Sequence, residues 1–354
     1  MIFDLNPFIF GISKKGFIKN DKNSTKNSWH GFYVDRHMKQ FILLLLFPVV
    51  ALSQSTVDKA EKLIDSKQFV KAQTILEEYV VSHPKDMDAI EMLGDAYGHQ
   101  KKWEPAIDNY KKLVAAEPKN ANFHYKYGGA MGMLALEVNK FKALGMLDDI
   151  KEAFQTSATL DPKHIEVRWA LVELYIQLPG IVGGSVSKSL TYANELEALS
   201  KVDGYLAKGY IYEYDDEPEK AEIYYKQAIE VGGSMTCYEK LTKLYESQKK
   251  PDKAIANIEE AQIKHKRNAL HYQIGKVAAE YNVELDKGKV CLMTYIENYS
   301  AADGVPKAWA YYRLAQIEKH QGNKSKALEH INVAISELPK IKPFKQEKQE
   351  ILAL

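Results

Sequence analysis

Cysteine is scarce in this chain. Only Cys237 and Cys291 occur among 354 residues, in different parts of the sequence. There is therefore no Cys-x-x-Cys pair, and a His-Glu-x-x-His motif is also missing, so the common ligand spacings of zinc sites are absent. Cysteine is among the most frequently buried residue types, and we expect both to be small core residues. A disulfide between them would require Cα atoms within about 7 Å of each other.

An excess of charge of either sign is missing as well. Lys and Arg together number 48 and Asp and Glu 47, which gives a formal net charge of +1. Proteins that bind nucleic acid or anionic membranes usually carry a basic surface, so this balance gives no reason to expect either partner. The content of 45% apolar and 27% charged residues is typical of a folded soluble protein.

Sequence motifs of catalysis are not found. The chain has no Gly-x-Ser-x-Gly nucleophile elbow. The glycine-rich segment 180–189 is not a phosphate-binding loop, because three residues separate Gly184 from Lys188 and no apolar strand precedes it. The histidines His124, His164 and His271 are too far apart in sequence to form a metal motif. We therefore expect no enzymatic activity, no metal and no cofactor.

No apolar segment is long enough to cross a bilayer, which needs roughly 20 residues. The most apolar segment, Phe41–Leu52, follows Met38-Lys39-Gln40 and ends beside the small residues Ala51 and Ser53. A basic start, a short apolar run and small residues are typical of a secretory signal peptide at 38–53, and a buried core helix is the alternative.

The predicted signal peptide also indicates where translation begins and where the chain is cleaved. We expect translation to begin at Met38 and cleavage to follow Ser53. Residues 1–37 would then be an over-extended N-terminus without stable fold. The mature chain, with no transmembrane segment, would lie in the periplasm or cell envelope of a bacterium.

What the sequence does contain is a repeat. A shift by 34 residues places Ala72 on Ala106, Pro84 on Pro118 and Gly94 on Gly128, and a shift by 33 places Tyr212 on Tyr245 and Ala221 on Ala254. A period of this length indicates pairs of helices that bury their apolar faces only when several pairs stack.

The clearest unit, 87–120, contains Ile90, Leu93-Gly94, Tyr97, Ala106, Tyr110, Leu113 and Pro118. This spacing resembles the tetratricopeptide repeat (TPR). Units 202–234, 235–267 and 308–341 show it too, and 54–86 and 268–300 show it more weakly. The resemblance implies an all-α fold, a right-handed α-solenoid of about eight helix pairs over 54–341. Residues 342–354, with Phe344, Ile351 and Leu352, would form a short C-terminal capping helix.

Two units depart from the family length. In 121–164, Phe154 and Asp161-Pro162 arrive about ten residues late, so we expect both helices to be lengthened. Unit 165–201 contains the loop insertion 178–185, in which Pro179 ends the preceding helix and Gly180, Gly183 and Gly184 permit unusual backbone angles. Such an insertion either contributes to binding or is simply a tolerated loop.

The resemblance also implies a concave groove lined by first-helix side chains at fixed positions of each repeat. Carried over by spacing, these are Asp88, Glu91, Asp95, Tyr125, Glu166, Trp169, Glu173, Tyr210, Glu213, Tyr214, Glu239, Glu246, Tyr272, Trp309 and Tyr312, with Lys243, Lys276 and Lys319 as a basic minority. The set lacks the Lys/Asn clamp that holds a C-terminal carboxylate in some TPR domains, so that ligand is not expected.

Carboxylates beside aromatic faces suit a partner segment bearing Lys or Arg. We expect Trp169 and Trp309 to be exposed. The resemblance, together with the predicted signal peptide, implies an exported scaffold or adaptor that binds a protein or peptide. A protein that binds a small molecule or glycan by aromatic stacking is the alternative, and a third interpretation is that these residues are merely solvated surface.

Overall fold

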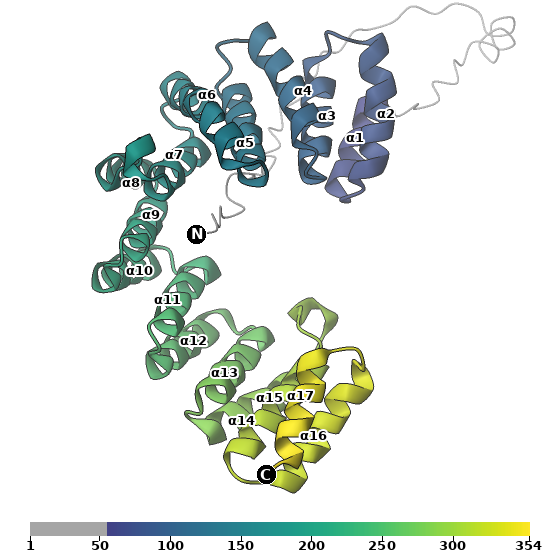
Figure 1. Cartoon of the computed structure of the whole chain (residues 1–354), viewed down its shortest axis with the longest axis vertical. Coiled ribbons are helices and arrows are strands. Elements are labelled where there is room, and N and C mark those ends of the chain that lie inside the picture. The colour runs from purple at the N-terminus through teal and green to yellow at the C-terminus, as the bar shows by residue number, and fades with distance from the viewer. Residues whose placement is uncertain (1–54) are drawn as a thin grey trace, which may run out of the picture. The chain divides into compact units, whose positions relative to one another are not determined.

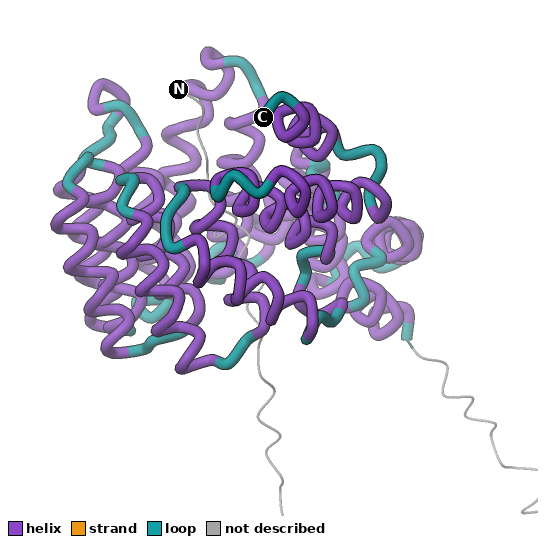
Figure 2. Tube along the Cα trace, turned by 90° about the horizontal axis from the view of Figure 1, so that it is seen from below, coloured by secondary structure: helices purple, strands orange, loops and turns teal. Residues whose placement is uncertain are grey.

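The computed structural model describes residues 55–354, and the predicted signal peptide and residues 1–37 lie outside them. Every regular element between Ser55 and Leu354 is a helix (Figure 2). These described residues run through eight successive helix pairs and a final single helix, whose order can be followed by the labels in Figure 1. In order these are α1 Thr56–Asp65, α2 Phe69–Ser82, α3 Met87–His99, α4 Trp103–Ala116, α5 Ala121–Glu137, α6 Lys140–Leu160, α7 Ile165–Gln177, α8 Val186–Leu199, α9 Lys201–Tyr214, α10 Pro218–Val231, α11 Met235–Ser247, α12 Pro251–His265, α13 Asn268–Tyr281, α14 Leu285–Glu297, α15 Lys307–His320, α16 Lys324–Glu337 and α17 Lys342–Leu352.

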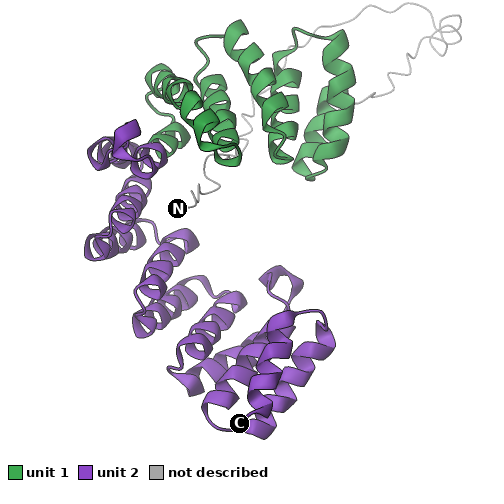
Figure 3. Cartoon of the chain, viewed as in Figure 1, with its two compact units in different colours: residues 1–171 green, residues 172–354 purple. Residues whose placement is uncertain are grey.

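The helices form two compact units that divide after Leu171, within α7 (Figure 3). In the first unit, α1 to α6 pack in sequence order, each helix on the next. In the second unit the same order holds from α8 to α17. The architecture is the all-α solenoid of helix pairs that the sequence predicts.

Helix starts and turns are fixed locally. Asp86 Oδ1 accepts a hydrogen bond from Ala89 N at 3.1 Å, and Asn139 Oδ1 accepts one from Lys142 N at 3.1 Å, which caps α3 and α6. The turn inside several pairs contains a residue in the left-handed region: φ is 58° at Lys67, Lys101 and Asp216, 53° at Lys249 and 78° at Gly322. These turns reverse the chain within a few residues, so the second helix of a pair packs on the first.

The two helices of a pair approach closely where the first helix has a glycine. A Cβ atom at Gly94 would lie 2.6 Å from Cε1 of Tyr110, and one at Gly209 would lie 2.4 Å from Cδ1 of Tyr225. Gly128 and Gly275 have the same relation to Phe154 and Leu292, at 2.9 and 2.3 Å. Because these distances are shorter than van der Waals contact, only glycine permits this separation of the helices.

The pair α5 and α6 contains the longest helices, 17 and 21 residues, against 10 to 15 in the others. This is the segment for which the sequence predicts lengthened helices. Residues 178–185 form a loop with one 3-10 turn at Gly180–Val182, and Ile181 is 95% exposed. Gly183 has φ 96°, and a Cβ at Gly184 would lie 1.6 Å from the carbonyl oxygen of Leu178, whereas Gly180 meets no neighbour within 4 Å.

The last helix, α17, covers α15 and α16. Phe344 and Ile351 are fully buried against Ala308, Ile331 and Ala334. Leu352, which the sequence places in the same contact, is instead 46% exposed, because the helix ends there and its side chain lies beyond the cluster.

Both cysteines are free thiols. Cys237 is buried on α11, whereas Cys291 on α14 is only half-buried. The expectation of two core residues is therefore right for Cys237 and right only in part for Cys291.

Replacement of Gly94 by Ala should lower the stability of the first unit. Alanine is normally better than glycine inside a helix by about 1 kcal/mol, but here the added carbon meets the fully buried ring of Tyr110. Overpacking of this kind costs about 1–3 kcal/mol, so the net effect is destabilising. Urea unfolding followed by circular dichroism measures it.

The matched control is Gly145→Ala on α6, where a Cβ meets nothing within 4 Å. This variant should be neutral or more stable by up to about 1 kcal/mol. Equal effects of the two substitutions would contradict the importance of the contact between Gly94 and Tyr110.

Candidate functional site

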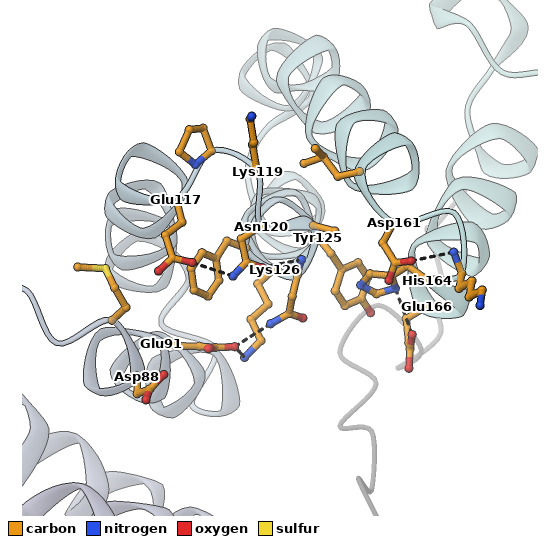
Figure 4. A pocket seen from close by; sticks show the side chains of 17 residues that line it. Asp88, Glu91, Glu117, Lys119, Asn120, Tyr125, Lys126, Asp161, His164 and Glu166 are labelled. Carbon is orange, nitrogen blue, oxygen red and sulfur yellow. Dashed lines mark hydrogen bonds and ion pairs between the residues drawn. The ribbon is translucent and has the colours of Figure 1, made fainter.

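The first unit contains a hollow of about 1180 Å³ on the side of its first helices (Figure 4). It is bordered by α3, α5 and the start of α7, and by the turns 117–120 and 161–164 that join successive repeats. Its lining residues are Met87, Asp88, Glu91, Glu117, Pro118, Lys119, Asn120, Ala121, Asn122, Phe123, Tyr125, Lys126, Leu160, Asp161, Lys163, His164 and Glu166. The hollow therefore brings together Asp88, Glu91, Tyr125 and Glu166 of the groove set.

Glu91 and Asp95 are already paired with a lysine of the next repeat. Lys126 Nζ lies 2.6 Å from Glu91 Oε1 and 2.7 Å from Asp95 Oδ2. Burial lowers the pKa of Lys126, but the charges of Asp95 and Glu91 and their hydrogen bonds outweigh it, so the pKa is raised overall. These two carboxylates are thus compensated within the chain by Lys126.

A second polar group lies at the far side of the hollow. His164 Nδ1 is 3.1 Å from Glu166 Oε2, and the His164 ring centroid is 4.9 Å from that of Tyr125. The hydrogen bond from His164 lowers the pKa of Glu166, against a smaller opposing effect of burial. Tyr125 is only 6% exposed, so its ring forms part of the floor and presents little open face.

The rim carries charges of both signs. Asp88, Lys119 and Lys163 are exposed, and within the described residues the side chains of Asp88 and Lys119 form no ion pair. Glu117 accepts a hydrogen bond from Asn120 Nδ2 at 3.1 Å, and Asp161 accepts one from the backbone N–H of Lys163 at 2.8 Å. The edge of the hollow therefore carries exposed side chains of both charges.

In the second unit, Glu173 on α7 is near enough to Tyr210 on α9 for its charge to act on that phenol. Glu173 is 1% exposed, and burial raises its pKa to about 8 although the charge of Lys240 opposes this. Gln177 Nε2 donates to the Tyr210 hydroxyl at 2.7 Å, and the Tyr210 ring centroid is 6.4 Å from that of half-exposed Tyr214.

Lys240 on α11 completes this cluster. Its Nζ lies 5.5 Å from the centroid of the Tyr210 ring, and burial lowers its pKa despite the charges of Glu213 and Glu173. Glu213 itself accepts a hydrogen bond from the Tyr225 hydroxyl at 2.6 Å. Four residues of the groove set, Glu173, Tyr210, Glu213 and Tyr214, are thus brought together in the second unit.

The remaining members of the groove set have other surroundings. Tyr272 is 6% exposed with its ring 5.4 Å from Tyr295, and Tyr312 stacks on Phe344 at 5.0 Å. The expectation of exposed tryptophans is wrong for Trp169, which is 8% exposed. It holds only in part for Trp309, which packs edge-on against Phe344 at 4.9 Å. Large rings on the first helices fill space in the core and are covered there.

Sequence reasoning missed the lysines Lys126 and Lys240. Each is the sixth residue of its repeat, counted from residues 121 and 235. The available signal was an acid on the first helix of one repeat and a base on the first helix of the next, as in Asp95 and Lys126, which are 31 residues apart.

No group of three or more His, Cys, Asp or Glu side chains in the described part of the chain could hold a metal ion. Within residues 55–354, no helix has both the length and the apolarity to cross a membrane.

Comparison with known proteins agrees with the helix pairs. Two family models described as tetratricopeptide repeat match residues 88–120 and 202–231, which correspond to α3–α4 and α9–α10. The chain is a tetratricopeptide-repeat protein. This fold suggests a scaffold for protein–protein interaction, and TPR proteins are generally not enzymes. No curated protein matches the sequence.

Solved structures of TPR proteins are similar to this one at low identity. A tetratricopeptide repeat protein from Parabacteroides merdae is 16% identical, with 84% of this chain and 97% of that chain covered and a TM-score of 0.45. A thermophilic TPR protein in Thermus thermophilus is 18% identical, with 65% and 96% covered and a TM-score of 0.37. YrrB, a TPR protein with an unusual peptide-binding site, is 17% identical, with 56% and 98% covered and a TM-score of 0.40.

The buried carboxyl of this TPR protein predicts a pH dependence of stability. The pKa of Glu173 is raised to about 8 from 4.5, so the folded state holds a proton that the unfolded state releases as pH rises from about 4.5 to 8. Glu173 therefore costs stability increasingly over that range. Glu173→Gln removes the cost, and should raise the free energy of unfolding by about 2–4 kcal/mol at pH 8.5.

At pH 5 the carboxyl is protonated in the folded chain, and the same substitution should have little effect. Urea midpoints of wild type and variant at both pH values provide the measurement. A gain of stability that is the same at pH 5 and pH 8.5 would show that Glu173 does not titrate in this way.

Proposed function

We propose that this TPR protein is an exported scaffold that holds a segment of a partner protein in the hollow of its first unit. The observation that carries the proposal is that three successive repeats contribute to one open hollow, through α3, α5 and the start of α7. A surface built from successive repeats suits an extended segment, which contacts each repeat in turn.

The chemistry of the hollow supports a partner segment with charges of both signs. Asp88 and Glu117 can accept from Lys or Arg, and Lys119 can bind a carboxylate. The interior charges Glu91 and Lys126 are mutually compensated, so they add little net attraction. The partner's Lys or Arg would therefore contact the rim of the hollow.

A glycan is less well supported. Sugar rings bind on open aromatic faces, and in this hollow the aromatic side chain of Tyr125 is 6% exposed. Its ring is already flanked by His164 and Phe154, at centroid distances of 4.9 and 6.2 Å.

Reversal of two rim charges should abolish partner binding. The variant Asp88→Lys with Lys119→Glu changes exposed side chains that form no ion pair within residues 55–354, so the fold should be retained. Capture from envelope extracts, followed by identification of the bound chain by mass spectrometry, should recover a partner with wild type and lose it, about tenfold or more, with the variant.

The control is Asp108→Lys with Lys111→Glu on α4, which makes the same charge changes on exposed residues outside the hollow. It should retain the partner. Equal recovery with both double variants would place the binding surface elsewhere.

Export is the second element of the proposal, and it rests on the sequence of 38–53. We expect the mature protein from its native host to begin at Gln54, as intact-mass measurement and N-terminal sequencing would establish. Recovery of a mature form that retains residues 1–37 would contradict it.

A further inference from the structure

The second unit contains three buried glutamates, and one of them has no compensating partner. Glu318 is fully buried and pairs with Lys289, and Glu347 is 4% exposed and lies 2.6 Å from Lys319 Nζ. Glu173 is 1% exposed, but its carboxyl forms no hydrogen bond or ion pair within the described residues, and Oε2 is sealed from solvent. A buried carboxyl without a partner is costly, because it loses its hydration and gains nothing in return.

Two groups around Glu173, the phenol of Tyr210 and the ammonium of Lys240, could also form a further hydrogen bond or ion pair. Tyr210 accepts from Gln177, which leaves the phenol proton available for donation. Lys240 lies over the Tyr210 ring but forms no hydrogen bond or ion pair in residues 55–354, although Glu173 and Glu213 are near enough for their charges to act on it. Glu213 is engaged by Tyr225.

Lys126 in the first unit shows what a well-placed lysine does in the same position of a repeat. Its ammonium contacts both carboxylates of the preceding repeat within 2.7 Å. Lys240, the sixth residue of its own repeat, reaches neither Glu173 nor Glu213 within ion-pair distance. The cluster therefore resembles a cation-binding site in which the chain's own cation, Lys240, does not come close enough to the carboxylates to form an ion pair.

We propose that the cluster of Glu173, Tyr210, Tyr214 and Lys240 is a recognition site for a cationic side chain, Lys or Arg, of a partner protein. The incoming ammonium or guanidinium lies against the rings of Tyr210 and Tyr214 and displaces Lys240 toward solvent, and it is this displacement that opens the covered carboxyl of Glu173 for pairing. The inference rests on the proposed function in taking a protein segment as the ligand, but it concerns a surface other than the hollow of the first unit.

Binding at this site is linked to a proton. Glu173, with its pKa at about 8, must release its proton to solvent before it can pair with the cation. The charged and titratable groups that act on it or on Tyr210 and Lys240 are Glu213, Lys243 and Tyr214. The affinity should therefore rise as pH rises, by about tenfold from pH 6.5 to 7.5, and level off above 8.5.

The probe is a blocked hexa-arginine peptide, titrated calorimetrically into the full mature chain at 0.15 M salt, with its hexa-citrulline counterpart as the neutral isostere. Wild type should bind the arginine peptide and not the citrulline peptide. Glu173→Gln should weaken the affinity about tenfold or more, and Lys240→Met, which removes the competing ammonium, should strengthen it severalfold.

The control Glu230→Gln alters an exposed glutamate on α10, outside the groove set, and should leave the affinity unchanged. Binding that is the same for Glu173→Gln and wild type, weaker binding by Lys240→Met, or equal binding of the citrulline peptide would each overturn the proposal. If it fails while the rim variant Asp88→Lys with Lys119→Glu still loses the partner, the proposed function stands and only this site is wrong.

Discussion

The contact between a glycine on the first helix of a pair and a ring on the second determines much of this structure. Gly94 against Tyr110 and Gly209 against Tyr225 set how closely the helices approach. The same contact aims each phenol at a carboxylate of the first helix, Asp95 at 2.7 Å and Glu213 at 2.6 Å. The face of the ring therefore packs in the core, and its hydroxyl donates a hydrogen bond to a carboxylate. Packing and electrostatics are thus coupled at one residue.

This coupling explains why similar sequence patterns give different charge networks in the two units. In the first, Tyr110 and Lys126 bind the same carboxylate, Asp95, and Glu91 is near enough to share the ammonium. In the second, Tyr225 engages Glu213, and the other acid near Lys240 is Glu173, which is buried and out of reach for an ion pair. One lysine is therefore compensated and the other is not.

Much of the fold could be predicted from the sequence, because repeat positions occupied by Gly, Ala and Tyr report which side chains meet between helices. The turns within the helix pairs could not be predicted from residue type. Lys67, Lys101 and Lys249 adopt left-handed backbone angles that usually favour glycine. The charge network was missed in part because spacing shows that residues share a face, whereas ion pairing depends on reach and burial. Trp169 was misjudged for the same reason, since a first-helix position can face the core.

The burial of Glu173 is best understood by comparison with its two counterparts. Glu318 and Glu347 show that this fold can supply a cation to a buried carboxyl, from Lys289 and Lys319. For folding alone, a neutral amide at position 173 would be the better residue, because it carries no charge to desolvate. A carboxyl retained without a partner costs stability in the free chain. That cost disappears when the carboxyl is protonated, below its pKa of about 8, or when a cation pairs with it, and the cationic side chain proposed above would supply that charge.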